Sequence, residues 1–308
     1  MNRSGDRLDQ VAAELFRDYS RARLKGWVVS GALTVNGLSA KASSKVIGGE
    51  LIELKAQLQE DGQWLPEAID LDIVFEDPDI LVINKPAGLV VHPAAGNWSG
   101  TLLNGLLHHD PELATVPRAG IVHRLDKDTS GLMVVAKNVI AQHVLVQQLQ
   151  ARTVGRKYYA LVHGAVLEAG QVDLGIGRHR SQRTKMACEG EGAVQVKEAL
   201  TYYEPVENID EFTLLSVKLA TGRTHQIRVH MSHLGFPLVG DPVYGKRVAP
   251  KKLKANPGLI ALDQFPRQAL HATELRLCHP QTGLANQWQR DLPEDMACLL
   301  DHLRRCTA

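Results

Sequence analysis

Residues His123–Gly131 read HRLDKDTSG, which places one imidazole, two cations and two carboxylates within six residues, and the apolar run Leu132–Ala136 follows at once. Such a run predicts a buried strand. The charged loop is therefore held against the core, where an unpaired carboxylate is costly. A carboxylate in such a place is usually paired with a cation and is often a working group. Asp126, at the centre of the loop, is the first candidate site residue.

The segments on either side of this loop predict a mixed domain over residues 71–308 in which strands predominate. Apolar runs favour strands, and apolar residues three or four apart favour helices. The expected strands are Ile80–Asn84, Leu132–Ala136, Tyr158–Val162 and Phe212–Leu219, and the expected helices are Thr101–His108, Asn138–Gln150 and Gln226–Leu234.

Residues 1–56 show a different pattern, which predicts a separate small domain. The expected elements are helices over Asp9–Tyr19 and from Ser20 toward Gly31, a hairpin turn at Asn36–Gly37 and a strand over Glu50–Leu54. An Asn-Gly pair between short apolar runs is a strong hairpin signal. Residues 57–70 are polar and rich in turn formers, which indicates a linker.

The composition is that of an ordinary globular protein, with 44% hydrophobic and 22% charged residues among 308. No apolar run approaches the roughly 18 residues of a membrane span, and the N-terminus lacks the apolar core of a signal peptide. The four cysteines form no Cys-x-x-Cys pair. We therefore expect a reduced cytoplasmic protein without a membrane partner. Since no long heptad pattern is present, a monomer is expected.

The near-neutral net charge of +1 conceals an uneven distribution. Residues 1–55 carry nine lysines or arginines against six acidic residues, whereas the remainder carries 26 against 28. A basic N-terminal segment followed by a near-neutral remainder is a weak indication of a polyanionic partner. A surplus this small also fits an ordinary solvated surface.

Three further segments are dense in polar side chains: Asn84–Pro93, Arg156–Tyr159 and Thr221–His230. A loop carboxylate such as Asp126 can serve only to cap backbone N–H groups, and a strand tyrosine such as Tyr158 usually packs in the core. Arg228 has apolar neighbours, which indicates partial burial, where a guanidinium needs an anion. The residues alone leave the structural and catalytic interpretations of Asp126 and Tyr158 open.

His225, His230 and His233 raise the question of a metal site. Their spacing is not His-Glu-x-x-His and no carboxylate lies among them, so structural histidines are expected and no metal. The glycine-containing segments lack the phosphate-loop pattern, and no Gly-x-Gly-x-x-Gly follows a strand. No nucleotide cofactor is therefore expected.

Taken together, these segments resemble the RluA family of RNA pseudouridine synthases. Residues His123–Gly131 resemble its signature loop, and further segments recur in that family in the same order. They are Asn84–Gly88, Arg156–Tyr158, Thr221–His230, Gly240–Gly245 and Gln268–Ala272. The resemblance runs from about Ile73 to about Asp295. It implies an α+β fold, with a mixed, mainly antiparallel β-sheet catalytic domain of the pseudouridine synthase type and flanking helices.

The N-terminal residues resemble an S4 RNA-binding domain, a small α/β fold. Ser20–Lys25 resembles its basic helix start, and Val35–Gly37 and Gly48–Ile52 resemble its later turns and strand. With His92–Asn97, this combination is most similar to the branch of the family that modifies the helix 69 stem-loop of 23S ribosomal RNA. The resemblance thus implies 23S rRNA or the pre-ribosomal large subunit as partner.

The resemblance also implies roles at the catalytic site. Asp126 would be the essential carboxylate, which either attacks a carbon of the nucleotide or stabilises charge and moves a proton from the sugar. Tyr158 would stack on the uracil and could help to remove a proton. Arg228 would pair with Asp126, and an opposite charge nearby favours the ionised carboxylate. Since isomerisation gains no atoms, no cofactor is expected.

The residues expected to bind RNA are Arg21, Arg23, Lys25, Arg124, Arg223 and His225. Arg124 is placed to enter the RNA beside the flipped base, although a phosphate contact is the common alternative for arginine. The basic turn at Arg21, Arg23 and Lys25 would hold the RNA backbone and add affinity more than sequence choice.

Three other functions remain compatible with the sequence. The first is the same chemistry at a different rRNA or tRNA uridine. The second is a catalytically idle RNA-binding or ribosome-assembly factor, although the complete set of Asp126, Tyr158 and Arg228 argues against it. A metal hydrolase that uses His123, His225 and His230 is a distant third.

Overall fold

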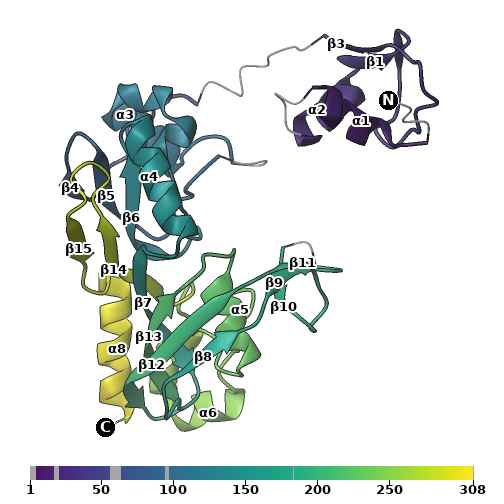
Figure 1. Ribbon diagram of the computed structural model, residues 1–308. Coiled ribbons are helices and arrows are strands. Elements are labelled where there is room, and N and C mark those ends of the chain that lie inside the picture. The colour runs from purple at the N-terminus through teal and green to yellow at the C-terminus, as the bar shows by residue number, and fades with distance from the viewer. Residues whose placement is uncertain (1–4, 17–20, 56–63, 94–96, 183, 308) are drawn as a thin grey trace. The chain divides into compact units, whose positions relative to one another are not determined.

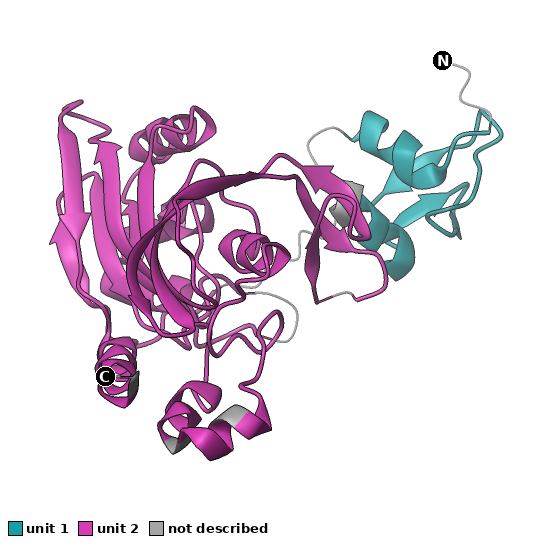
Figure 2. Ribbon diagram, turned by 90° about the horizontal axis from the view of Figure 1, so that it is seen from below, with its two compact units in different colours: residues 1–63 teal, residues 64–308 magenta. Residues whose placement is uncertain are grey.

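Contacts divide the chain into two units, residues 1–63 and residues 64–308 (Figure 2). The computed structural model describes residues 5–16, 21–55, 64–93, 97–182 and 184–307, while the side chains of residues 21–23, 252, 257 and 307 also lie outside the description. The described residues 64–70 belong to the second unit, where Trp64 packs against its core and the Asn104 amide donates to the Leu65 carbonyl at 2.9 Å.

The N-terminal unit packs two helices against a small antiparallel sheet. Helix α1 spans Leu8–Leu15 and α2 spans Arg21–Ser30, and the strands β1 (Leu33–Val35), β2 (Leu38–Ser39) and β3 (Ile52–Leu54) pair in the order β2-β1-β3. Its core is formed by Leu8, Ala12, Leu24, Trp27, Val28, Leu33, Ala42 and Val46. Both helices and the sheet contribute to this core, so the unit has a hydrophobic centre of its own.

The local expectations for this unit hold with two differences. The hairpin turn is confirmed, since Asn36 and Gly37 have φ of 52° and 76°, the left-handed values that a tight two-residue hairpin turn needs. Helix α1 ends at Leu15 rather than Tyr19, because the backbone leaves helical geometry at Phe16. The last strand begins later than expected, because the Glu50 carboxylate accepts hydrogen bonds from two preceding amides and closes a turn instead.

A nine-stranded sheet forms the centre of the second unit (Figure 1). Its strands are β4 (Ile73–Glu76), β5 (Ile80–Lys85), β6 (Ser130–Ala136), β7 (Gly155–His163), β8 (Gly170–Asp173), β12 (Leu200–Ile209), β13 (Phe212–Leu219), β14 (Leu270–Cys278) and β15 (Ala285–Gln289). They pair in the order β4-β5-β6-β14-β7-β13-β12-β8, and β15 pairs with β14. All pairs are antiparallel except β6 with β14. The expected α+β fold with a mainly antiparallel sheet is confirmed.

The parallel pair of β6 and β14 places a glycine requirement in the middle of the sheet. Gly131 on β6 has a φ of 119°, and a side chain there would collide with the backbone of Ala272 on β14. Glycine alone permits both this conformation and this approach. The glycine that ends the charged loop is therefore needed for strand pairing.

Helices cover both faces of this sheet. Alternate residues of β6 point to opposite faces: Leu132 and Val134 pack with helix α4 (Val139–Gln150), and Met133 and Val135 join the core that includes helices α3 (Leu102–His109) and α5 (Gln226–His233). The C-terminal helix α8 (Glu294–Thr307) packs with residues of β7 and β13 in a third cluster. The three helices expected from the sequence are present with ends within two residues of those predicted.

The remaining elements lie outside the central layers. A separate sheet of β9 (Ile176–His179), β10 (Met186–Cys188) and β11 (Ala193–Lys197) follows β8 and projects from that end of the unit (Figure 1). Short helices connect other segments: η1 (Pro111–Thr115), η2 (Pro117–Gly120), α6 (Pro250–Ala255), η3 (Pro257–Leu259) and α7 (Ile260–Asp263). Among the described residues, none of the helices combines the length and the apolar character that a membrane crossing requires.

Candidate active site

Strand pairing brings the three candidate catalytic segments together. Tyr158 on β7 pairs with Ala272 on β14, and Ala272 pairs with Gly131 on β6, so these residues form one row across the sheet. The charged loop therefore ends at Gly131 in the same row as Tyr158, with Ala272 between them. On the other side of Tyr158 lies Val217 of β13, the strand that leads into helix α5 and Arg228.

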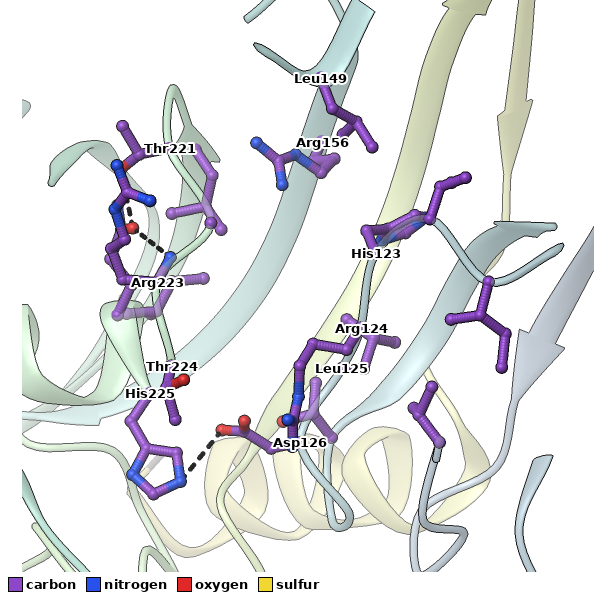
Figure 3. Close-up of a pocket in the computed structure, with 18 of the residues that line it drawn as sticks. His123, Arg124, Leu125, Asp126, Leu149, Arg156, Thr221, Arg223, Thr224 and His225 are labelled. Atoms are coloured by element: carbon purple, nitrogen blue, oxygen red, sulfur yellow. Dashed lines mark hydrogen bonds and ion pairs between the residues drawn. The ribbon is translucent and has the colours of Figure 1, made fainter. Parts of the chain in front are cut away.

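Tyr158, at one end of this row, lines a cavity of about 860 Å³. Its walls include the charged loop, the start of β7 and the loop from β13 to α5 (Figure 3). The arginines that line it are Arg118, Arg124, Arg152, Arg156, Arg223 and Arg228. Asp126 is the one acidic residue among the described residues that line the cavity. A wall with six guanidinium groups and one carboxylate suits a polyanionic ligand that is processed at the carboxylate.

Asp126 contacts the guanidinium that the sequence predicted for it. Arg228 Nη1 donates to Asp126 Oδ2 at 3.0 Å. The same guanidinium binds a second carboxylate, because Nε and Nη2 donate to Asp241 Oδ2 and Oδ1 at 2.7 and 3.0 Å. The side chain of Asp241 is fully buried and that of Arg228 is 5% exposed, whereas Asp126 retains 17% exposure toward the cavity. Asp126 is thus the accessible end of a buried carboxylate–arginine–carboxylate chain.

The charges of this chain stabilise one another. Burial raises the pKa of Asp241, but the hydrogen bonds and charge of Arg228 and the amides of Tyr244 and Val243 bring the pKa below its usual value. Burial lowers the pKa of Arg228, but Asp241 and Asp126 outweigh it and raise that pKa. The guanidinium is therefore permanently charged and rigidly held, which fixes the direction of the Asp126 contact.

His225 lies on the other side of Asp126. Its Nε2 is 3.9 Å from Asp126 Oδ2 and its Nδ1 is 2.8 Å from the Tyr244 hydroxyl (Figure 3 shows the contact with Asp126). His225 precedes helix α5 with a left-handed φ of 58°. Burial lowers its pKa, opposed by the charge of Asp126, which favours a neutral imidazole at neutral pH. His225 was expected to bind RNA, and the structure places it beside Asp126.

Tyr158 lies in the floor of the cavity with 5% of its surface exposed. Burial raises the pKa of its phenol, the charge of Arg156 lowers it and that of Asp126 raises it. The phenol is therefore neutral at physiological pH. A tyrosine ring that is held by the core and lines the cavity can support a flat base by stacking.

The expected RNA-binding residues fall into three groups. Arg124 is exposed at the cavity wall, and Arg223 lines the wall opposite, where its Nε donates to the Glu198 carbonyl at 2.8 Å. Lys25 is exposed on helix α2 of the N-terminal unit. The side chains of Arg21 and Arg23 lie outside the described part of the structure.

Buried polar groups hold the two site loops in place. The Gln226 amide accepts hydrogen bonds from Thr221 and the Arg223 amide and donates to the carbonyl of Leu200, which fixes the loop before α5. Lys85 is 1% exposed and its ammonium donates to the carbonyls of Pro86, Leu89 and Lys127 at 2.7, 2.9 and 2.9 Å. It thereby ties the charged loop to the end of β5.

The histidines considered for a metal site have other partners. His123 Nε2 accepts from the Val134 amide at 3.1 Å, and His230 lies between Thr201 Oγ1 and the Leu174 carbonyl at 2.9 and 3.0 Å. Within the described residues, the clusters with metal-ligand proximity are Cys188, Glu191, His233 and Asp77, Asp79, His279. Neither contains His123, His225 or His230, so the hydrolase alternative gains no support.

Asp241, Lys85 and Arg156 were not predicted as site residues. Asp241 lies in Gly240–Gly245, a segment quoted only as part of the family resemblance. A signal was available, since a buried guanidinium has two edges for carboxylates and Asp126 occupies only one. Arg156 was read as part of a basic segment, and its burial at the cavity depends on the pairing of distant strands.

Comparison with known proteins agrees with this geometry. Residues 79–233 match the family model described as RNA pseudouridylate synthase. The chain is 55% identical over 304 residues to ribosomal large subunit pseudouridine synthase D of Yersinia pestis, which covers 98% of this chain and 92% of the relative. It is 54% identical over 301 residues to the protein of that name from Pseudomonas aeruginosa, with 98% and 93% covered.

Solved structures with the same fold include two human proteins. Human RNA pseudouridylate synthase domain containing 4 superposes with a TM-score of 0.60 at 27% identity, over 75% of this chain and 92% of that one. Human RNA pseudouridylate synthase domain containing 1 gives a TM-score of 0.56 at 27% identity, over 77% and 96%.

Proposed function

The chain belongs to the RNA pseudouridylate synthase family, and from this we propose that it converts uridines of large-subunit ribosomal RNA to pseudouridine, with the helix 69 stem-loop of 23S rRNA as its target. Relatives that share over half of its residues along nearly the whole chain carry the name of large-subunit synthases. The resemblance to the helix 69 branch supports the finer assignment. Such a target places the protein with the pre-ribosomal large subunit in the cytoplasm.

The reaction is an isomerisation within one nucleotide. The C1′–N1 bond of uridine breaks, the uracil turns within the site, C5 bonds to C1′, and the proton on C5 leaves while N1 gains one. The atoms of substrate and product are the same, so the reaction needs no oxidant or external group. The target base must leave its stack to reach the cavity.

Asp126 is the residue that we assign to bond cleavage. It is the acidic residue of the described cavity wall, and Arg228 fixes one of its oxygens. Two routes remain open: the carboxylate attacks a carbon of the ribose to form a covalent intermediate, or it removes a proton from the sugar and stabilises charge. Both routes use the carboxylate oxygens that face the cavity.

The substrate would be held from two sides. Tyr158 would stack on the uracil, and Arg124 would enter the RNA in place of the extruded nucleotide. In the N-terminal unit, which we propose to be an S4-like RNA-binding domain, Arg21, Arg23 and Lys25 would bind the RNA backbone. The cavity contacts would act on the target nucleotide, and the N-terminal contacts would add affinity without reading sequence.

The observation that carries this proposal is that Asp126 is the one carboxylate among the described residues that line an arginine-rich cavity. Its test is pseudouridine mapping of 23S rRNA from cells with the gene, without it, and with an Asp126→Ala copy. We expect pseudouridine in helix 69 only with the wild-type gene. Loss of modification elsewhere in rRNA or in tRNA would redirect the target, and full modification with Asp126→Ala would instead support a non-catalytic assembly role.

A further inference from the structure

Arg156 is a buried cation at the cavity that has no anionic partner among the described residues. It lies at the start of β7, is 9% exposed, and forms part of the cavity wall. Its Nε is buried and has no hydrogen-bond partner in the part of the chain that the structure describes. A guanidinium is always charged and carries five N–H donors. Burial of such a group costs several kcal/mol unless an anion compensates it.

The position of Arg156 follows from the strand that carries it. Arg156 and Tyr158 are two residues apart on β7, so their side chains lie on the same face of the sheet, about 7 Å apart along the strand. The next residue of β7, Lys157, pairs with Lys218, so the end of β13 lies beside the part of β7 that carries Arg156. The loop that follows β13 therefore passes the Arg156 side chain.

That loop forms the other side of a small recess. The Arg156 guanidinium lies against Gly222, where a side chain would collide with Nη1. Figure 3 shows Arg156 directed toward the loop of Thr221 and Arg223, while Asp126 and His225 lie at the other end of the cavity. Arg223 uses Nε for the Glu198 carbonyl. Two guanidinium groups thus border the part of the cavity farthest from Asp126.

We propose that Arg156, assisted by Arg223, binds a backbone phosphate of the RNA strand beside the uridine that reacts at Asp126. This inference rests on the proposed RNA substrate. The phosphodiester is the anionic group that RNA offers, and its oxygens match the fork of a guanidinium. A uracil carbonyl would accept a hydrogen bond but would leave the buried charge uncompensated. The site for the base at Tyr158 and the site for the phosphate at Arg156 therefore lie next to one another.

The test pairs one protein change with a scan of the RNA backbone. The substrate is a synthetic oligoribonucleotide around the uridine identified by mapping, with one neutral methylphosphonate at each linkage in turn. With the unmodified RNA, Arg156→Gln should lower kcat/KM by about 10- to 100-fold. Because the contact is made equally before and during the reaction, the loss should fall on KM and leave kcat largely unchanged.

At the linkage whose phosphate Arg156 binds, the losses in kcat/KM from Arg156→Gln and from the methylphosphonate should not multiply. The wild-type enzyme should lose a similar factor when that phosphate is neutral, and Arg156→Gln should lose nothing further there. At every other linkage the variant and the wild type should respond alike. Turnover of the unmodified RNA by the wild type verifies the substrate independently of Arg156.

Two further variants keep the outcome clear. Arg156→Lys keeps the positive charge but lacks the planar set of guanidinium N–H donors. It should fold and show an intermediate loss of kcat/KM, which depends on the same linkage. Arg276→Gln removes an exposed arginine that pairs with Glu274 at 2.7 Å outside the described cavity wall, and it should behave as wild type. The phosphate site would be overturned if the losses in kcat/KM from Arg156→Gln and from the methylphosphonate multiplied at all linkages. It would also be overturned if the loss caused by Arg156→Gln were confined to kcat.

Discussion

The carboxylate of Asp241 accepts two hydrogen bonds from the guanidinium of Arg228, one at each oxygen, at 2.7 Å from Nε and 3.0 Å from Nη2. The third nitrogen of the guanidinium, Nη1, donates to Asp126 Oδ2 at 3.0 Å. Asp241 is too deeply buried to touch substrate. It is therefore a positioning residue, which acts on the reaction through the direction of the Arg228 side chain.

Asp241→Asn should lower kcat by about 100-fold, because a small displacement of Arg228 moves the reacting oxygen of Asp126. Affinity for the RNA should not change, because Asp241 is buried and is not among the described residues that line the cavity. Breaking the buried pair should also lower the free energy of unfolding by about 3 kcal/mol, which most folded proteins tolerate. Single-turnover kinetics, filter binding and urea unfolding measure the three effects.

The matched control is Asp295→Asn. Asp295 binds Arg267 in the same two-point manner, at 2.6 and 2.8 Å, outside the described cavity wall. This variant should lose stability and keep kcat. If Asp241→Asn retained the wild-type kcat, Asp126 alone would suffice to orient Arg228.

Asp126→Asn and Asp126→Ala should reduce turnover by about 10⁴-fold or more, as removal of an essential catalytic group does in other enzymes. RNA binding should persist, since the other five arginines that line the cavity form no ion pair with Asp126 in the described residues. Tritium release from RNA that contains 5-tritiated uridine measures turnover. Asp128→Asn, in the same loop, is the control, and substantial turnover by Asp126→Ala would refute the catalytic assignment.

The sequence predicts the strands around this site better than the pairing between them. Apolar runs located β5, β6, β7 and β13, and the charged loop identified Asp126. Strand β14, which joins β6 to β7, was not predicted, because its buried residues His271 and Thr273 are polar and hide the alternation of the strand. The neighbours of a strand also depend on residues far apart in the chain.

The pairing of Arg228 with Asp126 was predictable because a buried guanidinium needs an anion. The contact with Asp241 was missed because one anion was taken to be enough. Arg156 was missed for another reason, since its burial follows from the loop after β13 folding over β7. Local patterns therefore found Asp126 and Arg228, while the contacts of Asp241 and Arg156 required the fold.

Tyr158→Phe should separate the two functions of the tyrosine. It keeps the ring, so RNA affinity should be unchanged, and it removes the hydroxyl, so kcat should fall by about 100-fold if the hydroxyl assists proton transfer. Tyr158→Leu should in addition weaken RNA binding, because stacking on a base contributes about 1–3 kcal/mol. An unchanged kcat in Tyr158→Phe would limit the residue to stacking.

Two histidines with lowered pKa values, His123 and His271, should make the protein less stable in mild acid. Burial and then the charge of Arg156 lower the pKa of His123 to about 3, and burial and then the charge of Arg267 lower that of His271 to about 4. Unfolded histidines bind a proton below about pH 6.5. Between pH 6.5 and 4 the unfolded chain therefore binds more protons than the folded one, and the free energy of unfolding falls as the pH falls.

His271→Gln should make this decline shallower by up to about 1.4 kcal/mol per pH unit, the contribution of one such group. The interval from pH 6 to 5 is the most informative, because it lies below the unfolded pKa and above the folded one. Urea unfolding at a series of pH values gives the slope. His143→Gln, on the exposed side of α4, is the matched control and should leave the slope unchanged. An identical slope in His271→Gln and wild type would show that His271 takes up its proton equally in both states.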